Sequence, residues 1–270
     1  MNVTETHACH GGRQLVLTHA SDALSCDMTL GLFLPPDTGW PVPILWYLSG
    51  LTCTHENATV KAGLQLWAAE AGIAICFPDT SPRGDGVPDD DAFDTGQGAG
   101  FYVDATAEPW ARHFRMQSYV LDELPGALAA AQPIDLDRQA ITGHSMGGHG
   151  ALTLACKAPG RFRSVSAFAP IGNPSVSDWG QPQLTAYGLD PAAHDATALL
   201  RGGAALPPCL IDTGTEDPFR DKLGTAALAA AIAERNLPAT IRLQPGHDHS
   251  YFTISTFAGD HVAFHAEHLG

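Results

Sequence analysis

A five-residue segment in the middle of the chain, GHSMG at 143–147, has the pattern Gly-x-Ser-x-Gly. In many enzymes a serine in this pattern sits on a sharp strand-to-helix turn that exposes its hydroxyl as a nucleophile. The pattern is short enough to arise by chance, so its surroundings decide. Here it follows a strand-like run, RQAITG, and opens an apolar helical run, ALTLAC. Ser145 is therefore a candidate nucleophile. The alternative is a serine that only caps a helix after a tight turn.

A serine nucleophile needs a base to take its proton, and the base needs a carboxylate to orient it. These groups can follow the serine in the order acid, then histidine, each after a later strand. Asp217 lies just beyond the strand-like run PCLIDTG, and His249 lies just beyond ATIRLQP. We expect Asp217 to orient His249, although Asp217 could instead only cap a helix that begins near Phe219. Four neighbours compete for these roles: Asp212, Glu216, His247 and Asp248.

Acyl-transfer chemistry also needs N–H groups that stabilise the negative charge on the substrate oxygen. One is expected at Met146, directly after the serine and at the start of a helix. The other is expected at Leu51, because the apolar run VPILWYL at 42–48 ends at Ser49-Gly50, where the chain can turn. The same dipeptide could equally be a simple strand end.

The elements that must position these residues alternate along the chain. Apolar strand-like runs occur at 13–19, 26–35, 42–48, 72–77, 138–143, 163–170, 208–214 and 239–245, and helical patterns at 60–70, 117–131, 146–158, 223–235 and 251–268. This alternation predicts an α/β fold, a mostly parallel central sheet with an antiparallel N-terminal pair and helices on both faces. A long loop is expected at 79–109. With no internal repeat or linker, residues 1–270 are predicted to form one domain.

The composition excludes several other classes of protein. The 270 residues carry 14 Lys and Arg against 29 Asp and Glu, a net charge of −15, which argues against a general binder of nucleic acids or membranes. No apolar run approaches the ~20 residues of a membrane span, and the start of the chain lacks the pattern of a secretory signal. The six cysteines are scattered, with no Cys-x-x-Cys pair. We therefore expect reduced thiols and a cytoplasmic location.

Longer segments extend these short motifs: SGLTCTHEN, PDTSPRGDGVPDD, GQGAGFYVDAT, GHSMGGHGALTLA, FAPIGNP and PGHDHSYFTISTFAGDHVAFHA. Together they resemble the S-formylglutathione hydrolases of the esterase D family, from about Thr29 to His268. The resemblance implies an α/β-hydrolase fold and hydrolysis of S-formylglutathione to formate and glutathione, the last step of formaldehyde detoxification. It implies no cofactor and no metal, and it suggests a homodimer. A broad carboxylesterase or an acyltransferase on the same scaffold is the alternative.

The resemblance also implies roles for single residues. It gives the nucleophile as Ser145, the acid as Asp217, the base as His249, and the two N–H donors as Leu51 and Met146, in agreement with the positions argued above. The segment SVSDWG at 175–180 lacks the Cys-Pro that usually precedes its Trp-Gly, and His55 stands where the family more often has an acidic or another polar residue. These departures concern the pocket rather than the reaction.

Three residues are candidates for the substrate pocket. Cys53, two residues after Leu51, is either a redox-sensitive thiol or an ordinary buried cysteine. Trp179 could help the SGLTCT loop to close a shallow acyl pocket. Lys61 is a candidate for binding a glutathione carboxylate, or is an ordinary exposed helix lysine.

Two clusters look like metal ligands but are expected to be solvated. The acidic residues of the long loop lack the ligand order of a calcium site: they are Asp85, Asp89, Asp90, Asp91 and Asp94. Three histidines share one face of the C-terminal helix, where we expect surface side chains rather than a zinc site: they are His261, His265 and His268.

Overall fold

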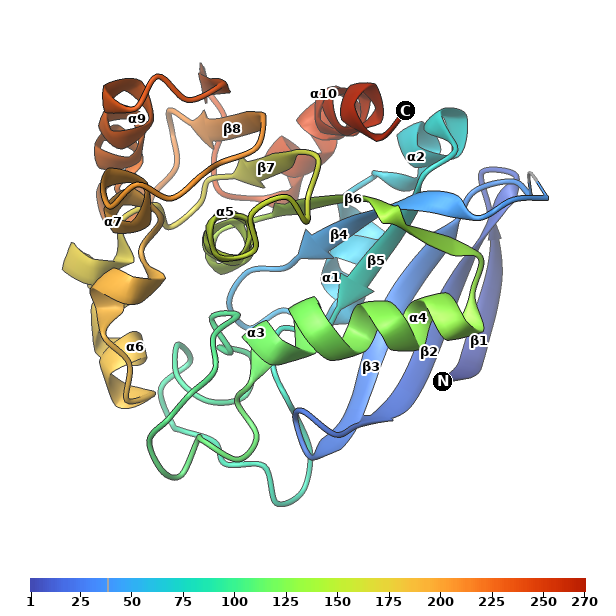
Figure 1. Cartoon of the computed structure of the whole chain (residues 1–270), viewed down its shortest axis with the longest axis horizontal. Helices are drawn as coiled ribbons and strands as arrows, with labels where there is room; N and C mark the ends of the chain where they lie inside the picture. Colours follow the sequence, from blue (N-terminus) through green and yellow to red (C-terminus); the bar gives the residue numbers. More distant parts are fainter. Residues whose placement is uncertain (38) are drawn as a thin grey trace.

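The apolar runs of the sequence fold as neighbouring strands of one mixed β-sheet (Figure 1). The computed structural model describes residues 1–37 and 39–270, and within them nine strands lie in the order β1-β2-β3-β5-β4-β6-β7-β8-β9. Their bounds are β1 Asn2–Cys9, β2 Gly12–Ser21, β3 Cys26–Leu34, β4 Val42–Leu48, β5 Ala74–Pro78, β6 Ile134–Gly143, β7 Val165–Phe168, β8 Cys209–Gly214 and β9 Ala239–Gln244.

The direction of the strands confirms the predicted fold class. From β5 across to β9, neighbouring strands are parallel. The pairs β1–β2, β2–β3 and β3–β5 are antiparallel. The predicted antiparallel N-terminal pair is therefore extended by a third strand, β1, whose largely exposed residues carry no apolar pattern.

Helices cover both faces of the sheet, as Figure 1 shows for α4 and α5 on one side and α2 and α10 on the other. The helices are α1 His55–Lys61, α2 Gln65–Ala71, α3 Met116–Ser118, α4 Leu124–Ala131, α5 Met146–Lys157, α6 Gln181–Ala186, α7 Ala196–Arg201, α8 Arg220–Leu223, α9 Thr225–Glu234 and α10 Tyr251–Leu269. No helix in the described ranges is both long and apolar enough to cross a membrane.

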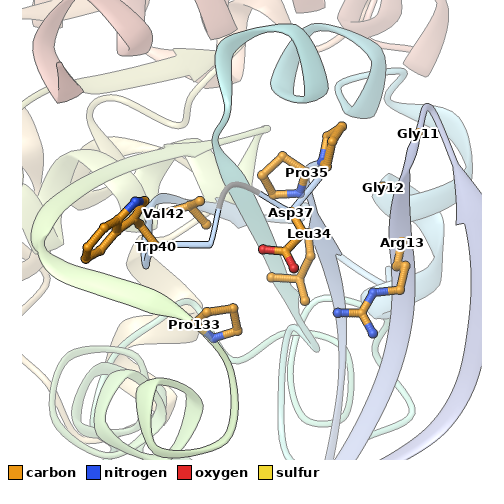
Figure 2. A pocket seen from close by; sticks show the side chains of 10 residues that line it. Gly11, Gly12, Arg13, Leu34, Pro35, Asp37, Trp40, Val42 and Pro133 are labelled. Carbon is orange, nitrogen blue, oxygen red and sulfur yellow. The ribbon is translucent and has the colours of Figure 1, made fainter.

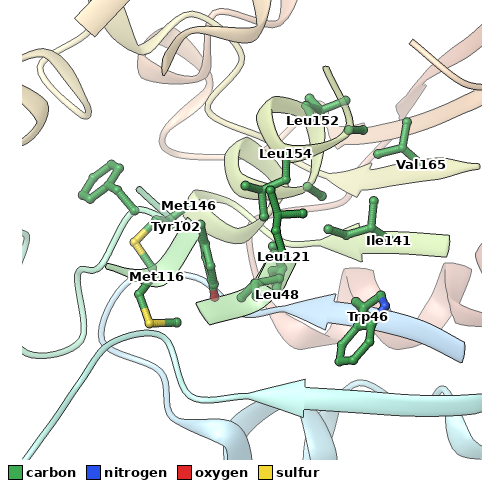
Figure 3. Close-up of a cluster of buried hydrophobic side chains, with 14 of the residues drawn as sticks. Trp46, Leu48, Tyr102, Met116, Leu121, Ile141, Met146, Leu152, Leu154 and Val165 are labelled. Carbon is green, nitrogen blue, oxygen red and sulfur yellow. The ribbon is translucent and has the colours of Figure 1, made fainter. Parts of the chain in front are cut away.

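The side chains of β4 alternate between two cores, because successive residues of a strand point to opposite faces. Trp46 belongs to the core under α4, α5 and α9, and Tyr47 to the core under α1, α2 and α10. Figure 3 shows part of the first core, in which Trp46 and Ile141 of the strands lie near Leu152 and Leu154 of α5. A strand buried on both faces explains why 42–48 reads as a continuous apolar run.

Two predicted helices differ in detail from the structure. The single helix expected at 60–70 is two helices, α1 and α2, because Gly63 between them adopts a left-handed φ of 68°. The helix expected at 117–131 consists of α3 and α4 joined by a π-helical turn, Tyr119–Glu123. Neither difference moves the strand ends on which the site is built.

The long loop after β5 packs against the turn that follows β4. The buried hydroxyl of Tyr102 donates to the carbonyl of Ser49 at 2.9 Å. The N–H of Thr52 donates to the carbonyl of Gly98, also at 2.9 Å. These bonds hold the Ser49-Gly50-Leu51 turn from the side opposite to β4.

A cavity of about 240 Å³ lies at the amino end of β4, where Val42 faces Leu34 and Pro133 (Figure 2). The turn at Ser49-Gly50 follows the carboxyl end of the same strand. This cavity is therefore separate from the candidate active site.

Candidate active site

Ser145 lies on a tight turn between β6 and α5. Its backbone has φ 57° and ψ −116°, a conformation that side chains ordinarily avoid. The flanking glycines allow the close packing of this turn. A Cβ on Gly143 would lie 2.3 Å from the carbonyl oxygen of Gly147, and a Cβ on Gly147 would lie 1.9 Å from that of Leu48. The Ser145 hydroxyl makes no capping bond to α5, so the reading of this serine as a plain helix cap is wrong.

A cavity of about 330 Å³ opens beside the Ser145 side chain. Its walls come from the turn after β4, the β6–α5 turn, the loops after β7, β8 and β9, and the long loop. The lining residues are Gly50, Leu51, Thr52, Cys53, Phe93, His144, Ser145, Trp179, Phe219, His249 and Tyr251. Residues that are far apart in the sequence thus meet at the carboxyl ends of the parallel strands.

The two loops after β8 and β9 pair a carboxylate with an imidazole. His249 Nδ1 lies 2.6 Å from Asp217 Oδ2, and the Asp217 side chain is fully buried. The other oxygen, Oδ1, accepts the N–H of Phe219 at 2.8 Å. Asp217 therefore contacts the ring and fixes the turn before α8, but the N-cap of α8 is Phe219 and carries no side-chain cap bond, so the interpretation of Asp217 as a helix cap is wrong.

The competing residues have other partners. Asp212 is engaged with Arg242 and His261, and Asp248 accepts the hydroxyl of Ser250. The other two point elsewhere: Glu216 is exposed, and the ring of His247 packs on Phe257. Within the described chain, none of the four lines the cavity.

The N–H groups of Leu51 and Met146 lie at the two turns that meet beside the serine. A Cβ on Gly50 would lie 3.3 Å from the Cβ of Ser145, so the turn after β4 is in contact with the serine turn. Met146 is the first residue of α5, where an N–H has no partner inside the helix. Across residues 1–37 and 39–270, neither N–H donates to a backbone carbonyl. Leu51 and Met146 therefore stay the candidate N–H donors to a substrate oxygen.

His144 is a further residue of the site that sequence reasoning did not single out. Its buried ring lies 4.4 Å from the ring of His249 and 6.1 Å from that of Tyr251, measured between centroids. Burial, and then the nearby His249, hold the pKa of His144 well below its usual value. A neutral ring therefore supports one face of His249.

Phe219 and Tyr251 were missed as well, although each lies two residues after a predicted catalytic residue. Among the described residues, the Ser145 hydroxyl and His249 line one cavity without a hydrogen bond between them, while Nδ1 of the ring bonds to Asp217. Such a bond is often long where no substrate is bound and tightens when one binds.

The three candidate pocket residues lie in different places. Cys53 lines the cavity, with its Sγ 3.8 Å from the Tyr251 hydroxyl. Burial raises the pKa of the Cys53 thiol, which favours the unreactive protonated form. Trp179 also lines the cavity. Lys61 is exposed in the last turn of α1 and does not line the cavity, so its contact with a substrate stays a prediction.

The expectation that the C-terminal histidines are surface side chains is wrong for two of them. His261 and His265 are fully buried. Both bond to Ser166, and His261 also bonds to Asp212 beneath the sheet. The helical period showed that the histidines share a face, but it could not show that this face packs on the sheet. In the described part of the chain, no three His, Cys, Asp or Glu side chains could hold a metal ion.

Comparisons with known proteins identify the family and the fold. The family model described as "Putative esterase" matches residues 21–268. The chain is 58% identical over 265 residues to an S-formylglutathione hydrolase of Paracoccus denitrificans, which covers 96% of this chain and 95% of that protein. It superposes with a TM-score of 0.97 on an S-formylglutathione hydrolase from Agrobacterium tumefaciens, at 47% identity and 100% coverage of both chains. A Staphylococcus aureus fluorophosphonate-binding serine hydrolase shares the fold, with a TM-score of 0.75 and 18% identity over 94% of this chain and 98% of that one.

Proposed function

This chain belongs to the esterase family, and we propose that within it the chain is a serine hydrolase that cleaves S-formylglutathione to formate and glutathione. The observation that carries the proposal is the similarity to relatives of that name over nearly the whole chain. The cavity supports it, because Leu51, Ser145 on its strained turn and His249, which pairs with Asp217, all line it, and Met146 directly follows the serine. These are the parts that acyl transfer requires.

In the proposed first step, His249 takes the proton of Ser145 as the serine oxygen attacks the thioester carbonyl. Asp217 holds the ring in the tautomer that presents its Nε2 to the serine, because the carboxylate accepts a hydrogen bond from the Nδ1–H group. The carbonyl oxygen becomes negative and accepts the N–H groups of Leu51 and Met146. Such donors typically contribute ~3–4 kcal/mol each to the stability of the transition state.

The carbon–sulfur bond then breaks and leaves a formyl ester on Ser145. Thiols have pKa values near 8.5, so glutathione leaves either as a thiol that takes the proton from His249, or as a thiolate, in which case His249 releases its proton to the solvent before the second step. Water replaces it, His249 takes a proton from the water, and the formyl ester is hydrolysed to formate. The serine regains its proton, and the enzyme is ready for a second cycle.

The test compares the wild-type protein with Ser145→Ala and with Ser255→Ala, a matched change at an exposed serine of α10. Three substrates are assayed: S-formylglutathione, a p-nitrophenyl ester, and the same ester with an added alcohol. We expect Ser145→Ala to abolish hydrolysis of both acyl substrates and Ser255→Ala to leave it intact. Equal rates for the ester and the thioester would favour a broad carboxylesterase. Transfer to the alcohol would favour an acyltransferase.

The proposal extends to the setting of the enzyme. The six cysteines are free thiols, three of them buried, which supports a reducing compartment such as the cytoplasm. We further propose a homodimer, following the resemblance to the family. Light scattering coupled to gel filtration measures the mass directly, and a monomer at micromolar concentration would contradict this part.

A further inference from the structure

A row of aromatic rings leads from the catalytic imidazole to the rim of the cavity. The ring of Phe219 stands edge-on to His249, with centroids 5.1 Å apart, and the ring of Trp179 lies 4.6 Å from Phe219. All three rings line the cavity. Beyond the last of them, the ammonium group of Lys222 lies 5.1 Å from the centre of the Trp179 ring. The row thus ends in a positive charge.

The backbones of Lys222 and Trp179 are linked through one hydroxyl. Ser177 Oγ donates to the carbonyl of Lys222 at 2.7 Å and accepts the N–H of Trp179 at 3.2 Å. The N–H of Lys222 in turn donates to the carbonyl of Phe219 at 2.8 Å. The backbone of Lys222 is therefore fixed relative to two of the rings, although its side chain is exposed.

The charge of Lys222 is uncompensated in a strongly acidic chain. Four arginines form ion pairs with carboxylates: Arg83, Arg138, Arg201 and Arg242. Within the described residues Lys222 forms no such pair, and its ammonium group lies over the indole of Trp179. The cavity lining, taken over the same described ranges, contains neither lysine nor arginine. Since the whole chain carries a net charge of −15, an anionic substrate gains from a local cation at the entrance.

We propose that Lys222 binds a carboxylate of the glutathione part of the substrate, and that Trp179 holds the ammonium group in place for it. This inference rests on the proposed function, because glutathione supplies the carboxylates, one at its glycine and one at its γ-glutamyl residue. The path from the His249 ring through Phe219 and Trp179 to the Lys222 ammonium group consists of three distances of about 5 Å each. An extended tripeptide spans about 10 Å, so for a carboxylate to contact Lys222 while the thioester lies at Ser145 the substrate must lie extended along this row.

The test uses three substitutions at Lys222. Lys222→Met keeps the apolar stem over Trp179 and removes the charge, Lys222→Arg keeps the charge, and Lys222→Glu reverses it. We expect kcat/KM for S-formylglutathione to fall about two- to fivefold with Met, mainly through KM, and about tenfold or more with Glu. Arg should retain most of the activity. Hydrolysis of p-nitrophenyl acetate, which has no carboxylate, should not change.

The control is Arg112→Gln, which removes one positive charge from an exposed side chain outside the cavity. It should leave both substrates unaffected. In 0.5 M NaCl the difference between Lys222→Met and wild type should shrink, since salt screens exposed charges. If Lys222→Met lowers the rates for both substrates equally, or for neither, the proposal is wrong.

A second measurement separates this proposal from the proposed function. S-methylglutathione, which cannot be hydrolysed, is used to inhibit p-nitrophenyl acetate hydrolysis. Its inhibition constant should rise by the same factor in Lys222→Met as KM does for the thioester. An unchanged inhibition constant, or no inhibition of the wild type, overturns the role of Lys222. Failure of the wild type to cleave S-formylglutathione would instead overturn the proposed function, and the inhibition constants would still report on Lys222.

Discussion

Replacing Gly147 by alanine should damage the reaction without touching a catalytic side chain. The added Cβ would lie 1.9 Å from the carbonyl oxygen of Leu48 and 2.6 Å from that of Ser49. Contacts under 3.0 Å are essentially never seen for a real Cβ, so the start of α5 and the end of β4 must move apart by about 1 Å. The N–H of Met146 travels with α5, whereas the N–H of Leu51 follows β4.

The separation therefore disturbs both proposed N–H donors at once. Losing one such donor typically costs 10²–10³ in kcat, and a displacement of about 1 Å has a comparable effect. We expect kcat of Gly147→Ala to fall by about 100-fold or more, with KM little changed, because these donors act mainly on the transition state. Overpacking should lower the free energy of unfolding by ~1–3 kcal/mol. Steady-state kinetics on a p-nitrophenyl ester and urea unfolding measure the two effects.

Gly126 of α4 offers the matched control. A Cβ there meets nothing within 4 Å. Alanine also favours a helix over glycine by about 1 kcal/mol. Gly126→Ala should therefore be slightly more stable than wild type, with normal kinetics. A folded Gly147→Ala protein whose kcat lies within about threefold of wild type would refute the reasoning, because these donors could then move without consequence.

Three further changes have expected outcomes. In Asp217→Asn a side-chain oxygen can still accept the N–H of Phe219, but the negative charge that faces His249 is lost. We expect kcat to fall about 10⁴-fold with little change in the urea midpoint. A variant with normal activity would contradict this expectation. Burial lowers the pKa of His149 to about 3, so the folded protein binds fewer protons there than the unfolded chain, whose histidines have a pKa near 6.5. Stability should therefore fall as the pH drops from about 6.5 towards 3, by about 1.4 kcal/mol per pH unit for this group. Urea titrations at several pH values should show a shallower fall for His149→Phe, and an unchanged slope would count against burial as the cause. Arg242→Met leaves the buried carboxylate of Asp212 without its main partner, which should cost about 3 kcal/mol in urea unfolding; a loss below 1 kcal/mol would mean that water compensates the charge.

The serine turn could be predicted from the sequence because chemistry restricts each of its positions. Gly143 and Gly147 have no room for a Cβ, and Ser145 supplies the hydroxyl, so the pattern carries its own geometry. Asp217 and His249 were predicted for a different reason. Parallel strands bring their carboxyl ends to one edge, so loops that follow successive strands converge there whatever their sequence.

The features of the fold and the site that the sequence did not predict depend on packing between segments that are distant in the chain. The burial of His261 and His265 follows from the docking of α10 on the sheet, which a helical period does not determine. The contacts of Trp179 with Phe219, and of His144 with His249, each join two loops and became visible only in three dimensions. The break at Gly63 arises where the chain must redirect α2, and one glycine in an otherwise helical pattern does not predict it.

The rings of Trp179, Phe219 and His249 come from three separate loops, which follow β7, β8 and β9. The nucleophile comes from β6, deeper in the sheet, where the strands on either side hold its turn. Of these three rings only His249 belongs to the proposed catalytic machinery, whereas Trp179 and Phe219 line the cavity. An engineer who seeks a new thiol or alcohol leaving group can vary Trp179 and Phe219 and leave Ser145, Asp217 and His249 as they are.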